Sequence, residues 1–179
     1  MYPFIRMTKE LIKARSQPPL DVWDTHVSHH ICWPWDIDLW MELNNGRTLT
    51  IYDLGRIPLA HRTGLIGLLK KERWSLTMAG ASVRWRRRVR PFEKVEMRSR
   101  ALGFDHRFFY LEQSMWNTSG ECANHALYRS AVTDRNGIVS PDRIVEAFGA
   151  QIVSPALPDW VVAWTDADAK RPWPPMQTP

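Results

Sequence analysis

The sequence predicts an α+β fold in which a curved antiparallel sheet wraps around one long central helix. Two observations support this prediction. After Arg73 the chain changes to long stretches of alternating apolar and polar residues, separated by short turns, which is typical of an antiparallel meander. Ahead of them, a helical stretch from Asn44 to about His61 carries apolar residues on more than one face. This pattern indicates a helix that is enclosed on most sides.

The segments before the meander are predicted from local signals. Residues 1–22 lack a sustained apolar run and are expected to form a docking segment or a frayed lead-in. Residues 25–33 alternate as a strand does. Asn44 is a suitable N-cap for the long helix, because its side chain can accept a hydrogen bond from a free amide. Pro58 is expected to kink or stop that helix.

The meander itself is expected to contain four strands, at residues 75–91, 94–104, 107–117 and 121–134. A short capped helix follows at residues 140–149, and the Pro-rich tail, residues 151–179, is expected to be extended. A sheet that curls around one long helix buries that helix economically, which is the hotdog architecture. We place this domain at residues 23–150.

Composition restricts the classes of function. The chain has 179 residues, enough for one domain, and its ten Trp indicate a wide aromatic pocket or a large interface. A net charge of +5 favours acidic small ligands such as phosphates. Cys32 and Cys122 stand alone, which predicts a reducing cytoplasm. No stretch approaches a membrane span. His29 and His30 point to opposite faces of a strand, so we predict no metal site. We also expect no cofactor.

The segment "DIDLWMELNNGRTLTIYDLGR", residues 36–56, resembles the hotdog-fold acyl-CoA thioesterases of the 4-hydroxybenzoyl-CoA thioesterase type. The strand region that follows, with its Pro-containing turn and "LEQ" strand, is also similar, and the resemblance covers roughly residues 25–148. It implies an enzyme that hydrolyses a fatty or aromatic acyl thioester to the free acid and coenzyme A.

The resemblance also implies the catalytic residues. A carboxylate ahead of the helix, here Asp38, acts as base or nucleophile, and the backbone N–H of Asn45 holds the thioester oxygen. The first turn of a helix offers unpaired N–H groups and a partial positive charge, which suits that role. Glu42 stands where relatives often carry His, so either Glu42 has taken over that role or activity is lost. Asp36 is expected only to shape the turn.

Substrate binding is assigned to aromatic, amide and basic side chains. Trp35, Trp40 and Asn44 surround the predicted helix start. In a strand, Arg84, Arg86, Arg88 and Arg90 would point the same way. Either Arg84, Arg86 and Arg88 bind the phosphates of coenzyme A, or the row is a solvated or intersubunit face.

Three other interpretations can be set against thioester hydrolysis. The first is a non-catalytic acyl-thioester-binding protein, which the loss of His at position 42 makes credible. A nucleic-acid-binding module is disfavoured because neighbouring acids offset the arginine row. A hotdog dehydratase would need His five residues after Asp38, where this chain has Leu43. For either thioester interpretation we expect a homodimer or a tetramer, because a lone hotdog sheet leaves a strand edge exposed.

Overall fold

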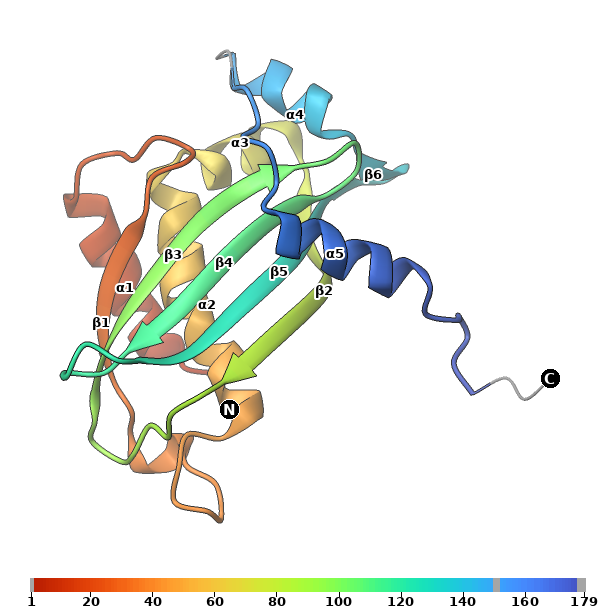
Figure 1. Ribbon diagram of the computed structural model, residues 1–179. Coiled ribbons are helices and arrows are strands. Elements are labelled where there is room, and N and C mark those ends of the chain that lie inside the picture. The colour runs from red at the N-terminus through yellow and green to blue at the C-terminus, as the bar shows by residue number, and fades with distance from the viewer. Residues whose placement is uncertain (1, 150–151, 177–179) are drawn as a thin grey trace.

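One antiparallel sheet curls around a long helix. The structure, a computed structural model, describes residues 2–149 and 152–176. Within them the strands follow the order β1-β3-β4-β5-β2, with β6 paired to β5. The strands are β1 (His26–Ile31), β2 (Ser75–Trp85), β3 (Lys94–Phe104), β4 (Phe109–Trp116), β5 (Cys122–Asp134) and β6 (Gly137–Val139). The concave side of the sheet holds α2 (Asn45–Arg62), which confirms the predicted hotdog fold (Figure 1).

The helix α2 packs closely against the middle of the sheet. Its buried residues Ile51 and Leu54 join a core with Met97 and Met115 of the strands. Gly55 marks the closest approach, because a Cβ added there would lie 2.6 Å from the Sδ atom of Met97. The missing side chain therefore lets the helix backbone rest directly on β3.

Pro58 does not stop α2, which was one of the two predicted outcomes. The helix continues to Arg62, although Pro58 has no N–H to donate to the carbonyl of Leu54. Both Pro58 and Leu59 are buried, so packing against the core compensates for the lost hydrogen bond. A second helix, α3 (Leu65–Glu72), follows after Gly64, whose φ of 82° turns the chain.

The lead-in is a formed helix rather than a frayed segment. α1 (Phe4–Ser16) lies against α2 and buries Met7, Glu10 and Ala14 (Figure 1). Three of its apolar residues, Phe4, Ile5 and Ile12, are 63–89% exposed, so the sequence pattern does not mark the buried face clearly. The helix is stabilised by tertiary packing of that face.

The C-terminal segment also departs from the prediction. The short helix α4 (Pro141–Phe148) forms as expected, but residues 159–169 are helical instead of extended. This helix, α5 (Asp159–Ala169), lies across the convex side of the sheet, opposite α2 (Figure 1). Val161 is fully buried there in a cluster with Leu102, Tyr110 and Leu127. Apolar burial therefore outweighs the Pro-rich composition around this helix.

Candidate active site

The segment between β1 and α2 is built around the buried carboxylate of Asp36. Arg6 Nη1 of α1 donates to Asp36 Oδ2 at 2.7 Å, and Arg47 Nη2 of α2 donates to Asp36 Oδ1 at 2.6 Å. The amide of Trp33 also donates to this carboxylate, at 3.2 Å. Asp36 therefore shapes the turn, as expected, and in addition joins two helices. All of its oxygens are engaged, so it is not available for chemistry.

A tight turn follows Asp36 and carries Asp38. The amide of Asp38 donates to Glu42 O at 2.9 Å, and the amide of Met41 donates to Asp38 O at 3.1 Å. Asp38 Oδ1 accepts the amide of Trp40 at 2.9 Å. We call residues 38–42 the 38–42 turn. Its hydrogen bonds hold Asp38, which is half-buried, at a fixed position ahead of the helix.

The start of α2 leaves two backbone donors open. Asn44 is the N-cap, and its side-chain oxygen accepts the amide of Arg47 at 3.1 Å. Asn44 O accepts the amide of Thr48 at 2.9 Å. Within residues 2–149 and 152–176, the amides of Asn45 and Gly46 donate to no acceptor. These two N–H groups lie at the positive end of the helix dipole, so they can bind a negatively charged oxygen.

Two adjoining hollows bring the predicted residues together. The larger, an open hollow of about 700 Å³, is lined by Asp38, Trp40, Glu42, Asn44 and Asn45. A narrower hollow of about 230 Å³ is lined by Glu42 and Asn45, together with Arg86 and Arg88. Because Glu42 and Asn45 line both, the helix start forms the boundary between the two hollows.

Glu42 is held in an ion pair. Arg88 Nε lies 2.9 Å from Glu42 Oε2, and the Glu42 side chain is 28% exposed. An arginine partner stabilises the ionised carboxylate and occupies one of its oxygens. Glu42 therefore fixes Arg88 at the edge of the narrower hollow, which is a different task from that of a free general base.

Arginine side chains were predicted to line one face of a strand, but this prediction is wrong beyond Arg84. Strand β2 ends at Trp85, and the consecutive amides of Arg86 and Arg87 both donate to Ala123 O, at 2.8 and 3.0 Å. Two residues facing one break the strict alternation of a strand. As a result Arg86, Arg87 and Arg88 all line the narrower hollow, whereas Arg84 lines neither of the two hollows at the helix start.

Of the two tryptophans predicted to bind substrate, one lies at the candidate site and the other does not. Trp40 lines the open hollow, as the prediction of a substrate-binding residue requires. Trp35 is 66% exposed and stacks on Trp33 with 5.2 Å between the ring centroids. It lines neither hollow, so the structure does not bring it to the candidate site.

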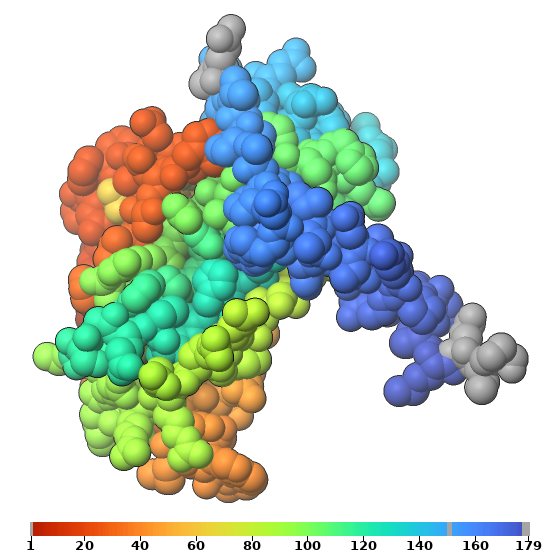
Figure 2. Space-filling model, in the orientation of Figure 1, coloured from red at the N-terminus to blue at the C-terminus, as the bar shows by residue number. Residues whose placement is uncertain are grey.

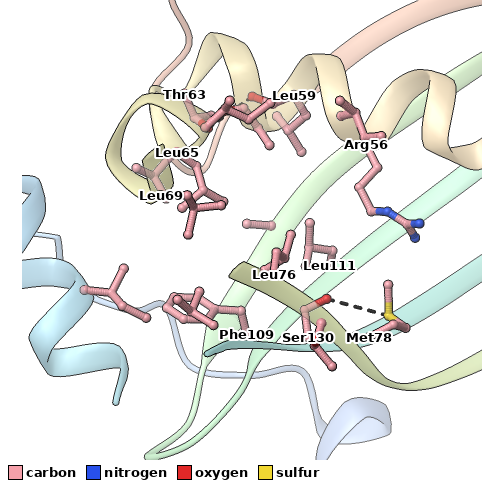
Figure 3. A pocket seen from close by; sticks show the side chains of 18 of the residues that line it. Arg56, Leu59, Thr63, Leu65, Leu69, Leu76, Met78, Phe109, Leu111 and Ser130 are labelled. Carbon is pink, nitrogen blue, oxygen red and sulfur yellow. Dashed lines mark hydrogen bonds between the residues drawn. The ribbon is translucent and has the colours of Figure 1, made fainter. Parts of the chain in front are cut away.

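A third cavity, missed by the sequence analysis, lies along the second half of α2 (Figure 3). It measures about 420 Å³, and its wall is mainly apolar, with Leu59 and Leu69 on the helix side and Leu76, Met78 and Phe109 on the sheet side. Arg56, which pairs with Asp53, borders it. The alternation of β2 places Leu76 and Met78 on one face, which was the available signal for this cavity.

The fold and the hollows at the helix start can be compared with known proteins. The family model of the thioesterase-like superfamily matches residues 32–165. The chain belongs to this superfamily. It is 32% identical to Protein THEM6 of Xenopus laevis over 163 residues, covering 90% of this chain and 77% of that protein.

Solved structures share the fold. The crystal structure of the probable thioesterase YbaW from Escherichia coli superposes with a TM-score of 0.64 at 12% identity, covering 69% of this chain and 96% of that one. The DHNA-CoA thioesterase of Staphylococcus aureus superposes with a TM-score of 0.56 at 15% identity, covering 81% and 91%. At such identities the likeness concerns the fold alone.

The part of the chain that the structure describes shows neither a metal site nor a membrane-spanning helix. No group of three or more His, Cys, Asp or Glu side chains is placed there to hold a metal ion. None of the helices there combines the length and the apolar character needed to cross a membrane.

Proposed function

We propose that the protein is an acyl-CoA thioesterase, which hydrolyses an acyl thioester to the free acid and coenzyme A. One observation carries this proposal: Asp38 and Asn45 line the same hollow at the start of α2, and the amide of Asn45 has no acceptor among the described residues. A carboxylate beside a pair of unpaired amides supplies both groups that acyl transfer needs. Membership of the thioesterase-like superfamily supports it.

In this mechanism the amides of Asn45 and Gly46 hold the thioester oxygen as negative charge develops on it. Asp38 Oδ1 already accepts a hydrogen bond, and its second oxygen takes the proton of an attacking water or attacks the carbonyl carbon itself. In the water route, the new C–O bond replaces the C–S bond, and the proton passes from the carboxyl group to the leaving thiolate. Coenzyme A leaves as the free thiol.

The narrower hollow suits the nucleotide part of coenzyme A. Arg86 and Arg88 line it, and their guanidinium groups are the kind of donor that binds phosphate through paired hydrogen bonds. Glu42 keeps Arg88 in place without cancelling the charge of Arg86. Substrate thiol and acyl group would then meet at Asn45, where the two hollows adjoin.

The apolar cavity along α2 suits the acyl chain of a fatty thioester. Asp53, the first residue of α2 at the cavity, follows Asn45 by eight residues, or about 12 Å along the helix axis. A long acyl chain attached at the helix start could reach this cavity, whereas a short one could not. We therefore infer a preference for long acyl chains.

A homodimer completes the proposal. Strand β2 is at the edge of the sheet, and Leu76, Met78 and Trp85 on it are 41–43% exposed. An exposed edge with apolar residues invites pairing with a second copy. Pairing of β2 with the β2 strand of a second copy would continue the sheet across a two-fold axis and close the open side of the apolar cavity.

A non-catalytic thioester-binding protein is the second candidate, favoured by the Arg88 partner that occupies Glu42. Release of free thiol from a panel of acyl-CoA esters separates the two candidates. We expect turnover that rises with acyl chain length. Tight binding of acyl-CoA by the wild type without any thiol release would assign the protein to the second candidate.

A further inference from the structure

Five large apolar side chains project into solvent at the end of the molecule where α2 begins. They are 64–89% exposed, and they are Trp35, Leu39, Trp40, Met41 and Phe92. Isolated exposed apolar residues are normal on a protein surface, but a group of this size indicates an interaction site. We call these five residues the apolar tip.

The loops of the apolar tip lie side by side. Leu43 N–H donates to Val89 O at 2.8 Å, which joins the 38–42 turn to the segment after β2. The ring of Trp33 packs against Phe92 at 6.2 Å and stacks on Trp35. Figure 2 shows these two segments together at the lower end of the molecule, in orange and light green.

Two residues of the apolar tip have a strained backbone conformation. Met41 and Phe92 have φ values of 57° and 63°, a left-handed conformation that favours Gly or Asn over bulky apolar residues. Hydrogen bonds close both turns, from Met41 N to Asp38 O and from Glu93 N to Arg90 O, each at 3.1 Å. The exposed side chains of the apolar tip are therefore carried by two loops whose turns are closed by hydrogen bonds.

A cluster of arginines lies beside the apolar tip. Arg86, Arg87, Arg88 and Arg90 precede Phe92, and all four are exposed. Arg87 and Arg88 pair with Glu121 and Glu42. In the described ranges of the chain, the guanidinium groups of Arg86 and Arg90 form no ion pair. The surface is thus apolar at its projecting points. The unpaired arginines Arg86 and Arg90 lie beside it, together with the half-buried carboxylates of Asp38 and Glu93.

We propose that this end of the protein docks on an anionic lipid bilayer. Tryptophan at a bilayer interface and basic residues near anionic headgroups are the two contacts that bind proteins to such surfaces. The five side chains are 64–89% exposed, which suits insertion between headgroups. A second copy fits poorly, because a two-fold contact through this surface would bring unpaired arginines close to their own copies. The open hollow that Trp40 lines faces the same end.

The apolar contribution is tested with vesicles of phosphatidylcholine containing one third phosphatidylserine, in a flotation assay of the full chain. The double variant Leu39→Ser, Met41→Asn removes two apolar contacts and gives Met41's left-handed position a better-suited residue. We expect it to lose at least tenfold in bound fraction at limiting lipid. The control Val153→Ser changes a residue that is 79% exposed away from this end, and it should bind like the wild type.

The charge contribution is tested with Arg90→Gln, which should weaken binding to the anionic vesicles by about fivefold, while the exposed Arg135→Gln in the β5–β6 turn should not. Binding should also fall with added salt and on pure phosphatidylcholine. These outcomes concern vesicle binding alone, so they are independent of thioester hydrolysis. The proposal is overturned if the wild type stays unbound on both vesicle types. It is equally overturned if the double variant floats like the wild type, or if it changes only the oligomeric state in sedimentation.

Discussion

Asp36 and Arg47 form an ion pair, with 2.6 Å between Oδ1 and Nη2, that connects the turn before α2 to the first turn of the helix. Because Arg6 of α1 binds the other oxygen of the same fully buried carboxylate, the position of the candidate active site depends on the N-terminal helix. A residue that the sequence marks only as a turn former therefore determines where Asp38 and Asn45 lie.

Replacing Asp36 by Asn should destabilise the fold. The change leaves two arginines facing a neutral amide, and breaking a buried pair in this way costs about 3 kcal/mol. Chemical denaturation measures the free energy of unfolding. Asp24→Asn, at an exposed position before β1, is the control and should be close to neutral. An unchanged midpoint for the Asp36 variant would contradict this role.

Replacing Asp38 by Asn should lower kcat by roughly a hundredfold or more, because the variant keeps the size and the hydrogen bond to Trp40 but loses the basic oxygen. Thermal unfolding should be unchanged. Glu42→Gln weakens the pair with Arg88 and should mainly raise KM for acyl-CoA. If Glu42→Gln were the inactive variant and Asp38→Asn were active, the two carboxylates would exchange roles.

Replacing Arg86 by Ala should raise KM for acyl-CoA about tenfold and leave the turnover of thioesters without a nucleotide unchanged. Arg84→Ala is the matched control, since Arg84 is an exposed arginine two residues earlier that lines neither hollow at the helix start. Steady-state kinetics with both substrate types makes the comparison. Equal effects of the two substitutions would remove the phosphate-binding role of Arg86.

Replacing Leu76 by Trp should fill part of the apolar cavity and change the chain-length preference. Turnover of a hexadecanoyl thioester should fall at least tenfold, and that of a butanoyl thioester should change little. Ser75→Trp places the same ring on the opposite face of β2, so it should not affect the preference. A uniform loss for both chain lengths in the Leu76 variant would place the acyl chain elsewhere.

Acidification should destabilise the protein through His30. Burial, followed by the positive charge of Arg6, lowers the pKa of this histidine from 6.5 to about 3. Above pH 6.5 both states hold it neutral. As the pH falls below 6.5 the unfolded chain takes up a proton that the folded chain does not, so stability is lost.

This loss should amount to roughly 2–3 kcal/mol by pH 4.5. His30→Gln keeps a donor near Ser28, which lies 2.8 Å from His30 Nε2. It should remove about half of the dependence of the unfolding free energy between pH 6.5 and 4.5, because burial also lowers the pKa of His26 to about 4. His29→Gln changes an exposed neighbour and serves as the control. If the unfolding free energy depended on pH equally in both variants, His30 would not be a source of the acid destabilisation.

Local pattern was enough to predict the sheet and α2, because alternation and the N-cap Asn44 are properties of neighbouring residues. It was not enough for α1 and α5, whose stability comes from contacts with residues far along the chain, such as Arg6 with Asp36 and Val161 with Leu102. The prediction of an arginine row along one strand face was wrong for a similar reason. Nothing near Arg86 in the sequence reveals that its amide and the next one share the carbonyl of Ala123.

The position of α5 limits how copies of this protein can be arranged in a larger assembly. An uncovered convex sheet would offer a flat surface on which dimers could stack. Here Trp164 lies over Gly80, with 3.2 Å between its ring and a Cβ placed there, and Asp168 pairs with Arg129 beside it. Stacking of dimers through that side would have to displace both contacts. In the proposed homodimer, in contrast, growth by strand addition at β2 would stop after two copies, because pairing would use the one free edge that β2 presents.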